Sequence, residues 1–306
     1  MKEQILEILR SSDEIVSGAA LSDMLGISRV SVWKHIQGLK EHGYEINASS
    51  QGYRLAGSPD ALFPWEFPGR KSKIHYFSEV DSTMDIAREL ARGECPDFSV
   101  VIAGSQKQGR GRLRRSWHSS KGGLYFTVVL RPLIPPVLSP RVNFCASLCL
   151  VQTLRRLFDI EAVVKWPNDI LVDDRKLCGM LSEMEAEADR VAYINVGVGL
   201  NANNDPTGVE PGAVSLKEIL NRSVPRKKIL SEFLDAFEAR LKIPDFDNVV
   251  KEWKAYTITL DRNVKIVTSQ ETSEGRAVDV DENGSLILAL DDGSMKTILY
   301  GDCFHL

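Results

Sequence analysis

Residues 106–117 are the most unusual stretch of the sequence, because they combine four arginines with two glycines directly after a strand-like run. Glycine lets a backbone approach a ligand closely, and the planar arginine side chain matches the oxygens of carboxylates and phosphates. The segment therefore predicts a site for an anionic ligand. Taken alone, it fits equally well a flexible basic surface loop or a contact to nucleic-acid phosphates.

A second candidate is Lys165, which stands on an apolar strand-like run and is followed at once by Pro167-Asn168-Asp169. A lysine on a buried side is rarely there for packing. The residues alone nevertheless favour a simpler interpretation, in which Lys165 faces solvent and the next residues form a hairpin turn. Because the sequence lacks both GxxxxGK[ST] and a convincing GxGxxG before a helix, any nucleotide site here is of another type.

Two helical patterns near the N-terminus are separated by a tight turn. Ser17 is a good cap for the first, Gly26 ends it, and Ser28 caps the second, whose apolar residues fall on one stripe. Residues 44–55 then change to period two around a polar turn, which predicts a hairpin. Helix, turn, helix and hairpin together predict a winged helix-turn-helix, whose second helix enters the major groove of DNA.

The charge of this N-terminal segment is local. Residues 1–57 carry six Lys and Arg against seven Asp and Glu, which argues against DNA binding by the segment as a whole. Residues 29–40 carry basic side chains and no acid, and a basic face on one helix is what a small DNA-binding head requires. DNA is therefore favoured over a protein partner. The residues expected to meet DNA are Ser28, Arg29, Ser31, Lys34 and Gln37.

The domain organisation follows from changes in periodicity. Residues 1–57 form the head, and the prolines of residues 58–68 predict a linker. Residues 69–255 combine strand-like runs joined by short turns with interspersed helices, which predicts an α+β domain with a mixed, largely antiparallel sheet. Residues 256–306 read as short strands separated by Asp-, Asn- and Gly-rich turns and predict a small β-barrel.

The composition bounds the class of protein. With 306 residues and a net charge of −4, the chain is long enough for several domains and is not one large polyanion-binding surface. Its five scattered cysteines fit a reducing compartment, and no structural zinc or other bound metal is expected. Residues 1–14 are too charged for a secretory segment, and no long apolar run follows. The sequence predicts a cytoplasmic protein without a membrane partner.

Five motifs occur in a characteristic order along the chain. They are Ser82-Thr83, Gly109-Arg110-Gly111-Arg112, Lys165-Trp166-Pro167-Asn168-Asp169, Lys176-Leu177-Cys178-Gly179-Met180-Leu181 and Gly197-Val198-Gly199-Leu200-Asn201. In this order the chain resembles biotin protein ligases over essentially its whole length. The winged head resembles that of the bifunctional members, which double as repressors of biotin genes.

The resemblance implies a fold, an activity and partners. The fold is a winged helix-turn-helix, a central α+β ligase domain and a small SH3-like β-barrel. The activity joins biotin to AMP, with ATP and Mg²⁺ and no permanent cofactor, and then transfers biotin to a lysine of a biotin carboxyl carrier protein. The repressor branch implies operator DNA as a second partner and a homodimer that forms on ligand or DNA binding.

The resemblance also implies roles for particular residues. Attack of a carboxylate on a phosphate brings two anions together, so the catalytic residues are expected to be the cations Lys165, Arg110 and Arg112. Ser82, Thr83 and Gln106 are expected to bind the ureido ring, and Trp117 the adenine. The whole set expected to bind biotin or biotinyl-AMP is Ser82, Thr83, Met84, Gln106, Gly109, Arg110, Gly111, Arg112, Trp117, Lys165, Gly197, Gly199 and Asn201.

Three alternatives compete with this interpretation. A biotin-sensing transcription regulator without ligase activity would need the ring-binding residues but not Lys165. A related ligase could act on lipoate or another small acid, although Gln106 and the complete motif set favour biotin. A nucleic-acid scaffold would leave residues 165–169 without a purpose.

Overall fold

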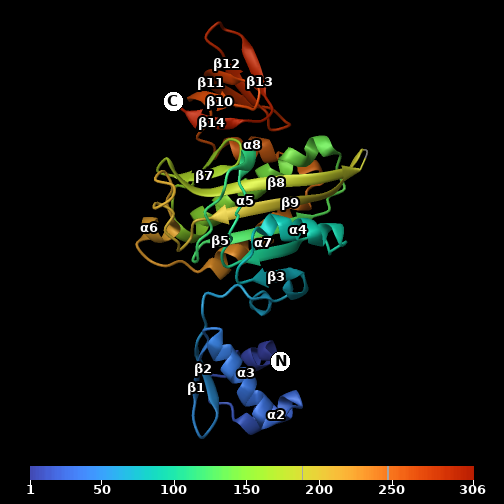
Figure 1. Cartoon of the computed structure of the whole chain (residues 1–306), viewed down its shortest axis with the longest axis vertical. Helices are drawn as coiled ribbons and strands as arrows, with labels where there is room; N and C mark the ends of the chain where they lie inside the picture. The colour runs from blue at the N-terminus through green and yellow to red at the C-terminus, as the bar shows by residue number, and fades with distance from the viewer. Residues whose placement is uncertain (188, 247) are drawn as a thin grey trace. The chain divides into compact units, whose positions relative to one another are not determined.

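The computed structural model describes residues 1–187, 189–246 and 248–306 (Figure 1). The chain forms two compact units, Met1–Pro68 and Gly69–Leu306. The first unit contains the predicted head together with residues 58–68. The second contains the predicted ligase domain and the C-terminal strands.

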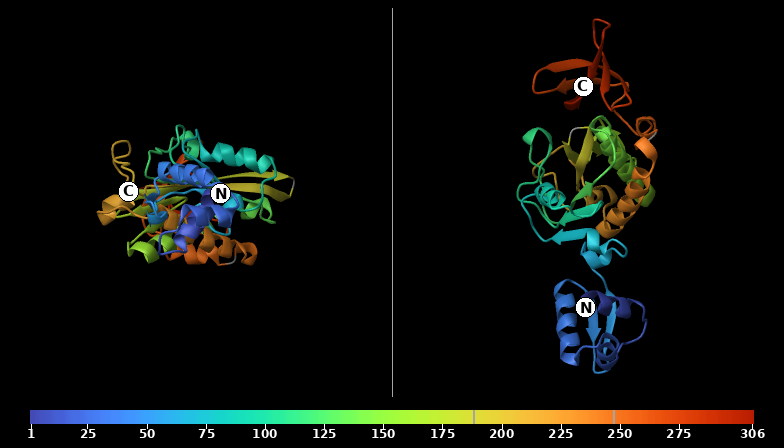
Figure 2. Two further views of the ribbon diagram at one scale, coloured as in Figure 1. Left: turned by 90° about the horizontal axis from the view of Figure 1, so that it is seen from below. Right: turned by 90° about the vertical axis from the view of Figure 1, so that its right-hand side faces the viewer.

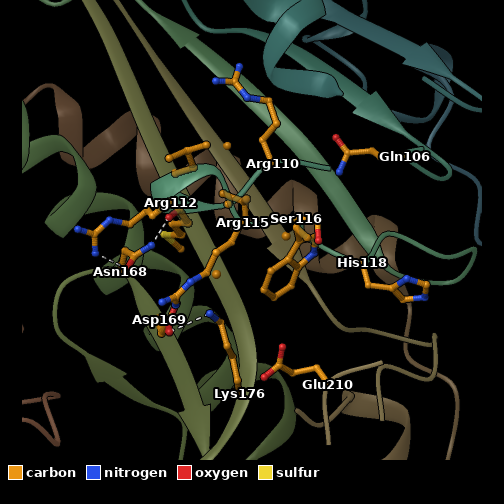
Figure 3. Close-up of a pocket in the computed structure, with 18 of the residues that line it drawn as sticks. Gln106, Arg110, Arg112, Arg115, Ser116, His118, Asn168, Asp169, Lys176 and Glu210 are labelled. Carbon is orange, nitrogen blue, oxygen red and sulfur yellow. Dashed lines mark hydrogen bonds and ion pairs between the residues drawn. The ribbon is translucent and has the colours of Figure 1, made fainter. Parts of the chain in front are cut away.

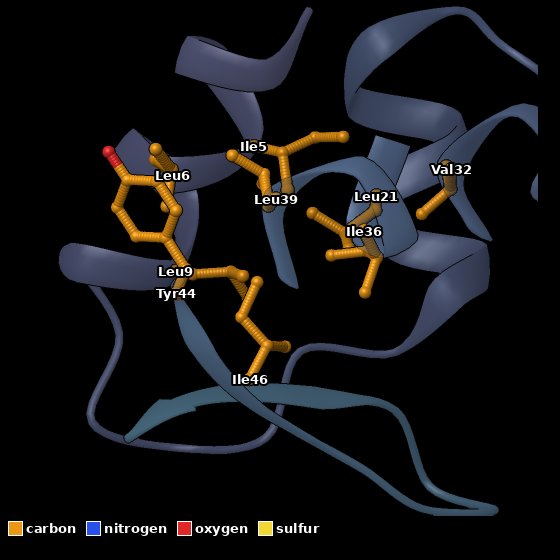
Figure 4. Close-up of a cluster of buried hydrophobic side chains, with 9 residues drawn as sticks. All are labelled: Ile5, Leu6, Leu9, Leu21, Val32, Ile36, Leu39, Tyr44 and Ile46. Atoms are coloured by element: carbon orange, nitrogen blue, oxygen red, sulfur yellow. The ribbon is translucent and has the colours of Figure 1, made fainter. Parts of the chain in front are cut away.

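The first unit is a bundle of three helices closed by a two-stranded antiparallel hairpin. Its caps are those that the sequence predicts: the Ser17 hydroxyl accepts from the backbone N–H of Ala20, and the Ser28 hydroxyl from that of Ser31. The winged helix-turn-helix is thus confirmed. Its elements are α1 (Lys2–Arg10), α2 (Gly18–Leu25), α3 (Arg29–Glu41), β1 (Glu45–Ala48) and β2 (Tyr53–Gly57). Figure 4 shows its core of Ile5, Leu6, Leu9, Leu21, Val32, Ile36, Leu39, Tyr44 and Ile46.

Residues 63–66 pack against this head rather than hanging free. The carboxylate of Glu66, in the short helix η1 (Pro64–Glu66), is buried and accepts from the Arg10 guanidinium at 2.7 Å and from the Tyr44 hydroxyl. The Trp65 indole donates to the Tyr44 hydroxyl at 2.9 Å, and its ring stacks on Phe63 with centroids 4.7 Å apart. The prolines predicted a linker here, but periodicity could not show that aromatic side chains between them have partners on the head.

The second unit is built on a seven-stranded mixed sheet in the order β3-β4-β5-β9-β8-β7-β6. Only β3 and β4 run parallel, and every other pair is antiparallel. The mixed, largely antiparallel α+β class is confirmed. The strands are β3 (Ile74–Phe77), β4 (Ser99–Ala103), β5 (Leu124–Leu130), β6 (Val163–Lys165), β7 (Asp169–Val172), β8 (Arg175–Glu187) and β9 (Arg190–Leu200).

Helices cover the two faces of this sheet, as the edge-on view of Figure 2 shows. On one face, Ala87 and Ala91 of α4 (Thr83–Arg92) pack against Val101, Val129 and Tyr193. On the other face, α5 (Ser139–Phe158) packs against α7 (Arg226–Leu241) and α8 (Val249–Lys254). The short elements are η2 (Lys71–Lys73), η3 (Arg112–Arg114), η4 (Pro136–Leu138), α6 (Leu216–Leu220) and η5 (Pro244–Phe246).

One helical stretch, Pro136–Phe158, is long and apolar enough to cross a membrane by length and composition. Most of its apolar window is buried inside the protein, however. Its side chains lie against α7, α8 and several strands of the sheet. A buried core helix of a globular domain can have the same length and apolar composition as a membrane-spanning helix.

The last strands form a five-stranded antiparallel sheet in the order β13-β12-β11-β10-β14. Hydrogen bonds and ion pairs tie it to the mixed-sheet domain: for example, the Trp166 indole donates to the Gly284 carbonyl at 2.9 Å, and the Arg141 guanidinium to the Glu282 carbonyl at 3.0 Å. At Gly284 (φ +87°), a Cβ would stand 2.4 Å from the Phe144 ring. The strands are β10 (Asn263–Val267), β11 (Thr272–Val280), β12 (Leu286–Ala289), β13 (Met295–Ile298) and β14 (Asp302–His305).

The last strand makes the stability of this sheet sensitive to pH. Burial, then the charges of Lys165 and Arg262, lower the pKa of His305 to about 4. Because the unfolded chain keeps a pKa near 6.5, it binds more protons than the folded protein between these values. We expect stability to fall as pH drops from about 6.5 to about 4, by on the order of 1 to 2 kcal/mol after discounting for solvent exposure.

Urea unfolding of the wild type and of His305→Gln at several pH values measures this effect. Glutamine keeps an amide that can donate toward Thr259, whose hydroxyl lies 3.3 Å from the imidazole Nε2, but it does not titrate. The wild type should lose stability more steeply than the variant over this pH range. Parallel pH profiles would show that His305 is not the group responsible.

Candidate active site

A cavity of about 400 Å³ opens at one end of the mixed sheet of the second unit. Its floor comes from β8 and β9, one wall from the start of α4, and its cover from the Gly- and Arg-rich segment that follows β4 (Figure 3). Asp302, the first residue of β14, reaches it from the C-terminal sheet. Segments from the start of α4, the stretch after β4, the β8–β9 pair and β14 therefore meet here.

The innermost polar groups are those of Ser82, Thr83 and Gln106. Ser82 caps α4 and accepts from the Met84 backbone N–H at 3.3 Å, while the Gln106 carbonyl oxygen accepts from the backbone N–H and the hydroxyl of Thr83 at 2.8 and 3.0 Å. The Thr127 hydroxyl donates to that of Thr83 at 2.9 Å. Ser82 and Thr83 are almost completely buried. A network held this firmly can present hydrogen-bonding groups to a small polar ring in a fixed arrangement.

The floor depends on glycines in β8 and β9. A Cβ at Gly199 would stand 2.4 Å from the Trp117 indole nitrogen, and one at Gly197 would stand 2.6 Å from the Met84 sulfur. Gly179 on the neighbouring strand faces the Trp117 ring in the same way, at 2.9 Å. Such distances are far below van der Waals contact, so the strands pass beneath these side chains only because the positions lack a side chain.

Trp117 lies over this floor as an apolar platform. The Lys176 ammonium lies 5.4 Å from the centre of its ring, within the range of a cation–π interaction. Its indole N–H is buried and has no hydrogen-bond partner among the described residues. A flat aromatic surface next to a cation suits a planar base that carries a phosphate.

Cations gather at the outer end of the cavity. The Arg112 guanidinium donates to the Asn168 side-chain oxygen at 3.2 Å, and burial lowers its pKa below the usual value. Lys176 pairs with Asp169 at 2.9 Å, and Arg115 pairs with Asp302. An anionic ligand entering here would meet three positive side chains whose present partners are protein oxygens.

Most of the predicted ligand-binding residues lie in the cavity wall, although the wall alone does not establish their roles. Asn201 is buried and accepts from the Asn204 amide at 3.0 Å. The predicted residues that line the cavity are Ser82, Thr83, Met84, Gln106, Arg110, Gly111, Arg112, Trp117, Gly197, Gly199 and Asn201.

Gly109 and Lys165 are outside this lining. Gly109 belongs to the cover, and a Cβ there would stand 2.4 Å from the Trp117 carbonyl oxygen. Lys165 ends β6 directly opposite Asp169, which does line the cavity. Burial raises the pKa of the Cys303 thiol to about 11 and lowers that of His305 to about 4; the positive charge of Lys165 acts on both groups, so its side chain lies near β14. The structure thus brings Lys165 to the border of the cavity and the C-terminal sheet.

The sequence interpretation omitted several lining residues. Those next to the recognised motifs, such as Arg115, Asn168 and Lys176, could have been included from their position. Glu210 and Asp302 carry no local signal, since neither belongs to a stretch of unusual composition. The omitted polar residues are Arg115, Ser116, His118, Asn168, Asp169, Lys176, Glu210 and Asp302.

In the head, the second helix of the motif presents the predicted side chains together with apolar ones. Arg29 and Lys34 are exposed, whereas Ser31 and Gln37 are half-buried. The exposed Ser28 also uses its hydroxyl to cap α3. The sequence interpretation left out Val30 and Trp33, which are 64% and 52% exposed. Arg29, Val30 and Trp33 line a hollow between α3 and the tip of the hairpin.

A mixed-sheet domain with a cation-lined cavity, a winged helix-turn-helix and a small antiparallel sheet together define a ligase joined to a DNA-binding head. Three family profiles match these parts in order: the HTH domain at residues 2–54, the Biotin/lipoate A/B protein ligase family at residues 76–201 and the Biotin protein ligase C terminal domain at residues 259–306.

Relatives match along nearly the entire chain. The Bifunctional ligase/repressor BirA of Bacillus subtilis (strain 168) is 33% identical over 97% of this chain and 96% of its own, and that of Escherichia coli (strain K12) is 28% identical over 96% and 94%. The structure of the biotin protein ligase from Aquifex aeolicus in complex with biotin and ATP is 27% identical, with a TM-score of 0.64 over 76% of this chain and 97% of its own. The protein belongs to the family of bifunctional biotin ligase/repressors.

This assignment confirms the interpretation drawn from the motifs. The ligase domain is present, which favours an enzyme over a regulator that only senses biotin. The helix-turn-helix domain of the repressor-type relatives is present as well.

Proposed function

We propose that the protein activates biotin with ATP to form biotinyl-AMP and transfers the biotin to a lysine of a biotin carboxyl carrier protein. The observation that carries this proposal is the polarity of the cavity. A fixed uncharged network of Ser82, Thr83 and Gln106 lies at its inner end, and three cations lie at its outer end. Biotin has the matching pattern, with a polar uncharged ring at one end and a carboxylate at the other.

The residues have distinct proposed roles. Gln106 and Thr83 hydrogen-bond the ureido ring, and Trp117 supports the adenine. Arg112 and Lys165 neutralise the carboxylate and the phosphate that it attacks, which allows two anions to approach each other. The position of Lys165 opposite Asp169 supports this role, because a lysine has the reach to enter the cavity from its border.

ATP is a substrate in this scheme, and we assign Mg²⁺ to its phosphates. One carboxylate together with phosphate oxygens is a common environment for Mg²⁺, and Asp169 in the cavity wall can supply the carboxylate. No group of three or more acidic, His or Cys side chains capable of holding a metal occurs in the described ranges. When bound, the ion supplies positive charge on the phosphates. We propose no permanent cofactor.

The domain assignment carries over from the sequence as a proposal. Residues 69–255 form the catalytic domain and residues 256–306 the small domain, which contributes Asp302 to the cavity. Residues 1–57 form the DNA-binding head, with residues 58–68 between them. We place the protein in the cytoplasm, where its DNA and carrier partners are found and where cysteines remain free.

Incubation of the full-length protein with biotin, ATP, Mg²⁺ and a biotin carboxyl carrier domain tests the enzymatic proposal. We expect pyrophosphate release, and a mass increase of the carrier equal to one biotinyl group. A protein that binds biotin but releases no pyrophosphate would instead support the sensor-regulator. Modification with lipoate in place of biotin would support the related ligase.

We further propose that the head binds operator DNA as part of a homodimer. The edge of β8 supports this: its ladder with β7 covers Arg175–Gly179, and no strand of the described ranges pairs with that edge beyond it. A second copy can add its own β8 there by two-fold antiparallel pairing. The exposed apolar side chains of Leu133 (99%) and Val137 (60%) lie just before α5, in a segment that contacts the start of β9 through Ile134. Dimerisation would place two weakly binding heads on two half-sites.

Ligand and operator binding are coupled in this proposal, because the cover over the ligand contacts β8, where Arg110 pairs with Glu183, and β8 provides the edge that a second copy meets. Arg112→Ala should speed dissociation of biotinyl-AMP by roughly tenfold, since a charge-assisted hydrogen bond is lost. It should also weaken ligand-dependent binding to operator DNA. Stopped-flow dissociation and fluorescence anisotropy with a labelled operator measure the two effects. A variant that loses only one of them would separate the two functions.

A further inference from the structure

Arg110 lines the cavity, but its charged group is turned toward other parts of the protein. Its guanidinium pairs with Asp85, in the first turn of α4, at 2.9 Å and with Glu183 of β8 at 2.5 Å. In Figure 3 its side chain extends away from Arg112 and Lys176. Of the two arginines in the Gly-Arg-Gly-Arg motif, only Arg112 lies among the outer cations.

The same two carboxylates hold a second arginine. Arg88 lies 3.1 Å from Asp85 and 2.6 Å from Glu183. Two positive and two negative side chains thus form a balanced cluster, which we name the parking cluster: Asp85, Arg88, Arg110 and Glu183. Each is 29–45% exposed, so solvent weakens the pairs without abolishing them. Contacts of this strength can hold a side chain and still release it.

We infer that Asp85 and Glu183 act as an internal anion that holds Arg110 in the empty protein and competes with the ligand for it. The inference rests on the proposed function, since the competing anion is the phosphate of biotinyl-AMP. When the ligand binds, Arg110 leaves the parking cluster and turns into the cavity. Arg88 remains behind and keeps the two carboxylates partly neutralised. The acids are positioning residues, because they act on the ligand only through Arg110.

A buried amide next to Glu183 reduces the cost of releasing Arg110. Asn195 of β9 lies directly opposite Glu183 in the ladder, so both side chains are on the same face, about 5 Å apart at their Cβ atoms. Asn195 is 1% exposed, and neither its amide nitrogen nor its oxygen has a hydrogen-bond partner among the described residues. The amide is a donor in reach of the carboxylate that Arg110 vacates. A buried donor without a partner is otherwise costly.

If Asp85 and Glu183 compete with the ligand for Arg110, removing an acid and removing Arg88 should change the dissociation rate of the ligand in opposite directions. Removing the charge of Glu183 weakens the hold on Arg110, so the ligand gains that arginine more easily and dissociates more slowly. Removing Arg88 leaves both acids to Arg110 alone and strengthens the hold, so the ligand dissociates faster. If the acids merely supported the fold of the segment, both changes would weaken ligand binding.

The experiment measures dissociation of biotinyl-AMP from the full-length protein in the variants Glu183→Gln, Asp85→Asn and Arg88→Gln. The complex is formed from biotin and ATP and chased with excess unlabelled ligand. We expect dissociation to slow by roughly threefold to tenfold in Glu183→Gln and to slow in Asp85→Asn as well, given the typical strength of charged hydrogen bonds. We expect it to accelerate by roughly threefold in Arg88→Gln.

Glu185→Gln is the matched control. Glu185 lies two residues further along the same face of β8 and pairs with Arg92 of α4 at 3.2 Å, without a contact to Arg110. Its dissociation rate should equal that of the wild type. Faster dissociation in both Glu183→Gln and Asp85→Asn, at unchanged melting temperature, would overturn the inference. A wild type that forms no biotinyl-AMP would instead overturn the proposed function on which it rests.

Discussion

Replacing Lys165 with alanine should lower the rate of pyrophosphate release by about 100- to 1,000-fold, a range typical for the loss of a group that stabilises developing charge. Lys165 is proposed to neutralise the biotin carboxylate and the attacked phosphate together. Without it, two anions must approach with less compensation of their charge, and Arg112, in η3, cannot replace a charge that reaches the cavity from β6. Biotin binding should change much less, because the Ser82, Thr83 and Gln106 network is untouched.

Two further variants make this result specific to Lys165. Lys165→Arg keeps the charge on a different shape and should retain part of the activity. Lys265→Ala removes a lysine of β10 that pairs with Glu274 at 3.3 Å on the C-terminal sheet, and it should leave the rate unchanged. Full activity of Lys165→Ala would transfer the proposed role to Lys176, which already lines the cavity.

Gly199→Ala should weaken biotinyl-AMP binding by about tenfold to a hundredfold. A methyl group there would overlap the Trp117 indole, since a Cβ would stand 2.4 Å from its nitrogen. Either the indole or β9 must shift, and both form part of the proposed adenine site. Equilibrium titration of the variant with biotinyl-AMP measures the loss.

Gly208→Ala serves as its counterpart, because a Cβ at Gly208 would meet nothing within 4 Å. Its affinity should equal that of the wild type. The melting temperature of Gly199→Ala should fall by a few degrees only, because the overlap is with one side chain at the edge of a cavity. Unchanged affinity at Gly199→Ala would show that Trp117 moves freely and would argue against its role as a fixed platform.

The helices and turns of the head could be predicted because their signals are local. The hydroxyls of Ser17 and Ser28 accept hydrogen bonds from backbone N–H groups at the starts of α2 and α3, as the type and position of these residues indicate. The C-terminal sheet was predicted less completely. Its turns, rich in Asp, Asn and Gly, predicted short strands between them, but no such turn signal marks β14, which includes Cys303, Phe304 and His305. That strand is defined by its ladder with β10, which only the folded chain reveals.

The cavity, too, combines residues with a local sequence signal and residues that only the folded chain brings together. Ser82 belongs to one of the five ordered motifs, Gln106 and Trp117 bound the unusual stretch of residues 106–117, and all three line the cavity. Asp302 comes from a strand about 185 residues after Trp117, so nothing in its surroundings marks it. The parking cluster is also formed by distant residues: nothing in the sequence distinguishes Asp85 and Glu183 from other acids, and only the folded chain brings both to Arg110.

The indole of Trp166 has a consequence for how far this protein can be treated as a set of exchangeable modules. Asp169 lines the cavity and Lys165, the proposed catalytic cation, ends β6 opposite it, whereas Trp166, between them in sequence, donates to a carbonyl of the C-terminal sheet. The tight fit of Gly284 against the Phe144 ring lies at the same point. The motif that carries the proposed catalytic lysine thus also holds the small domain through a hydrogen bond. A chimera that exchanged that domain would alter the support of Lys165 even if every catalytic residue were kept.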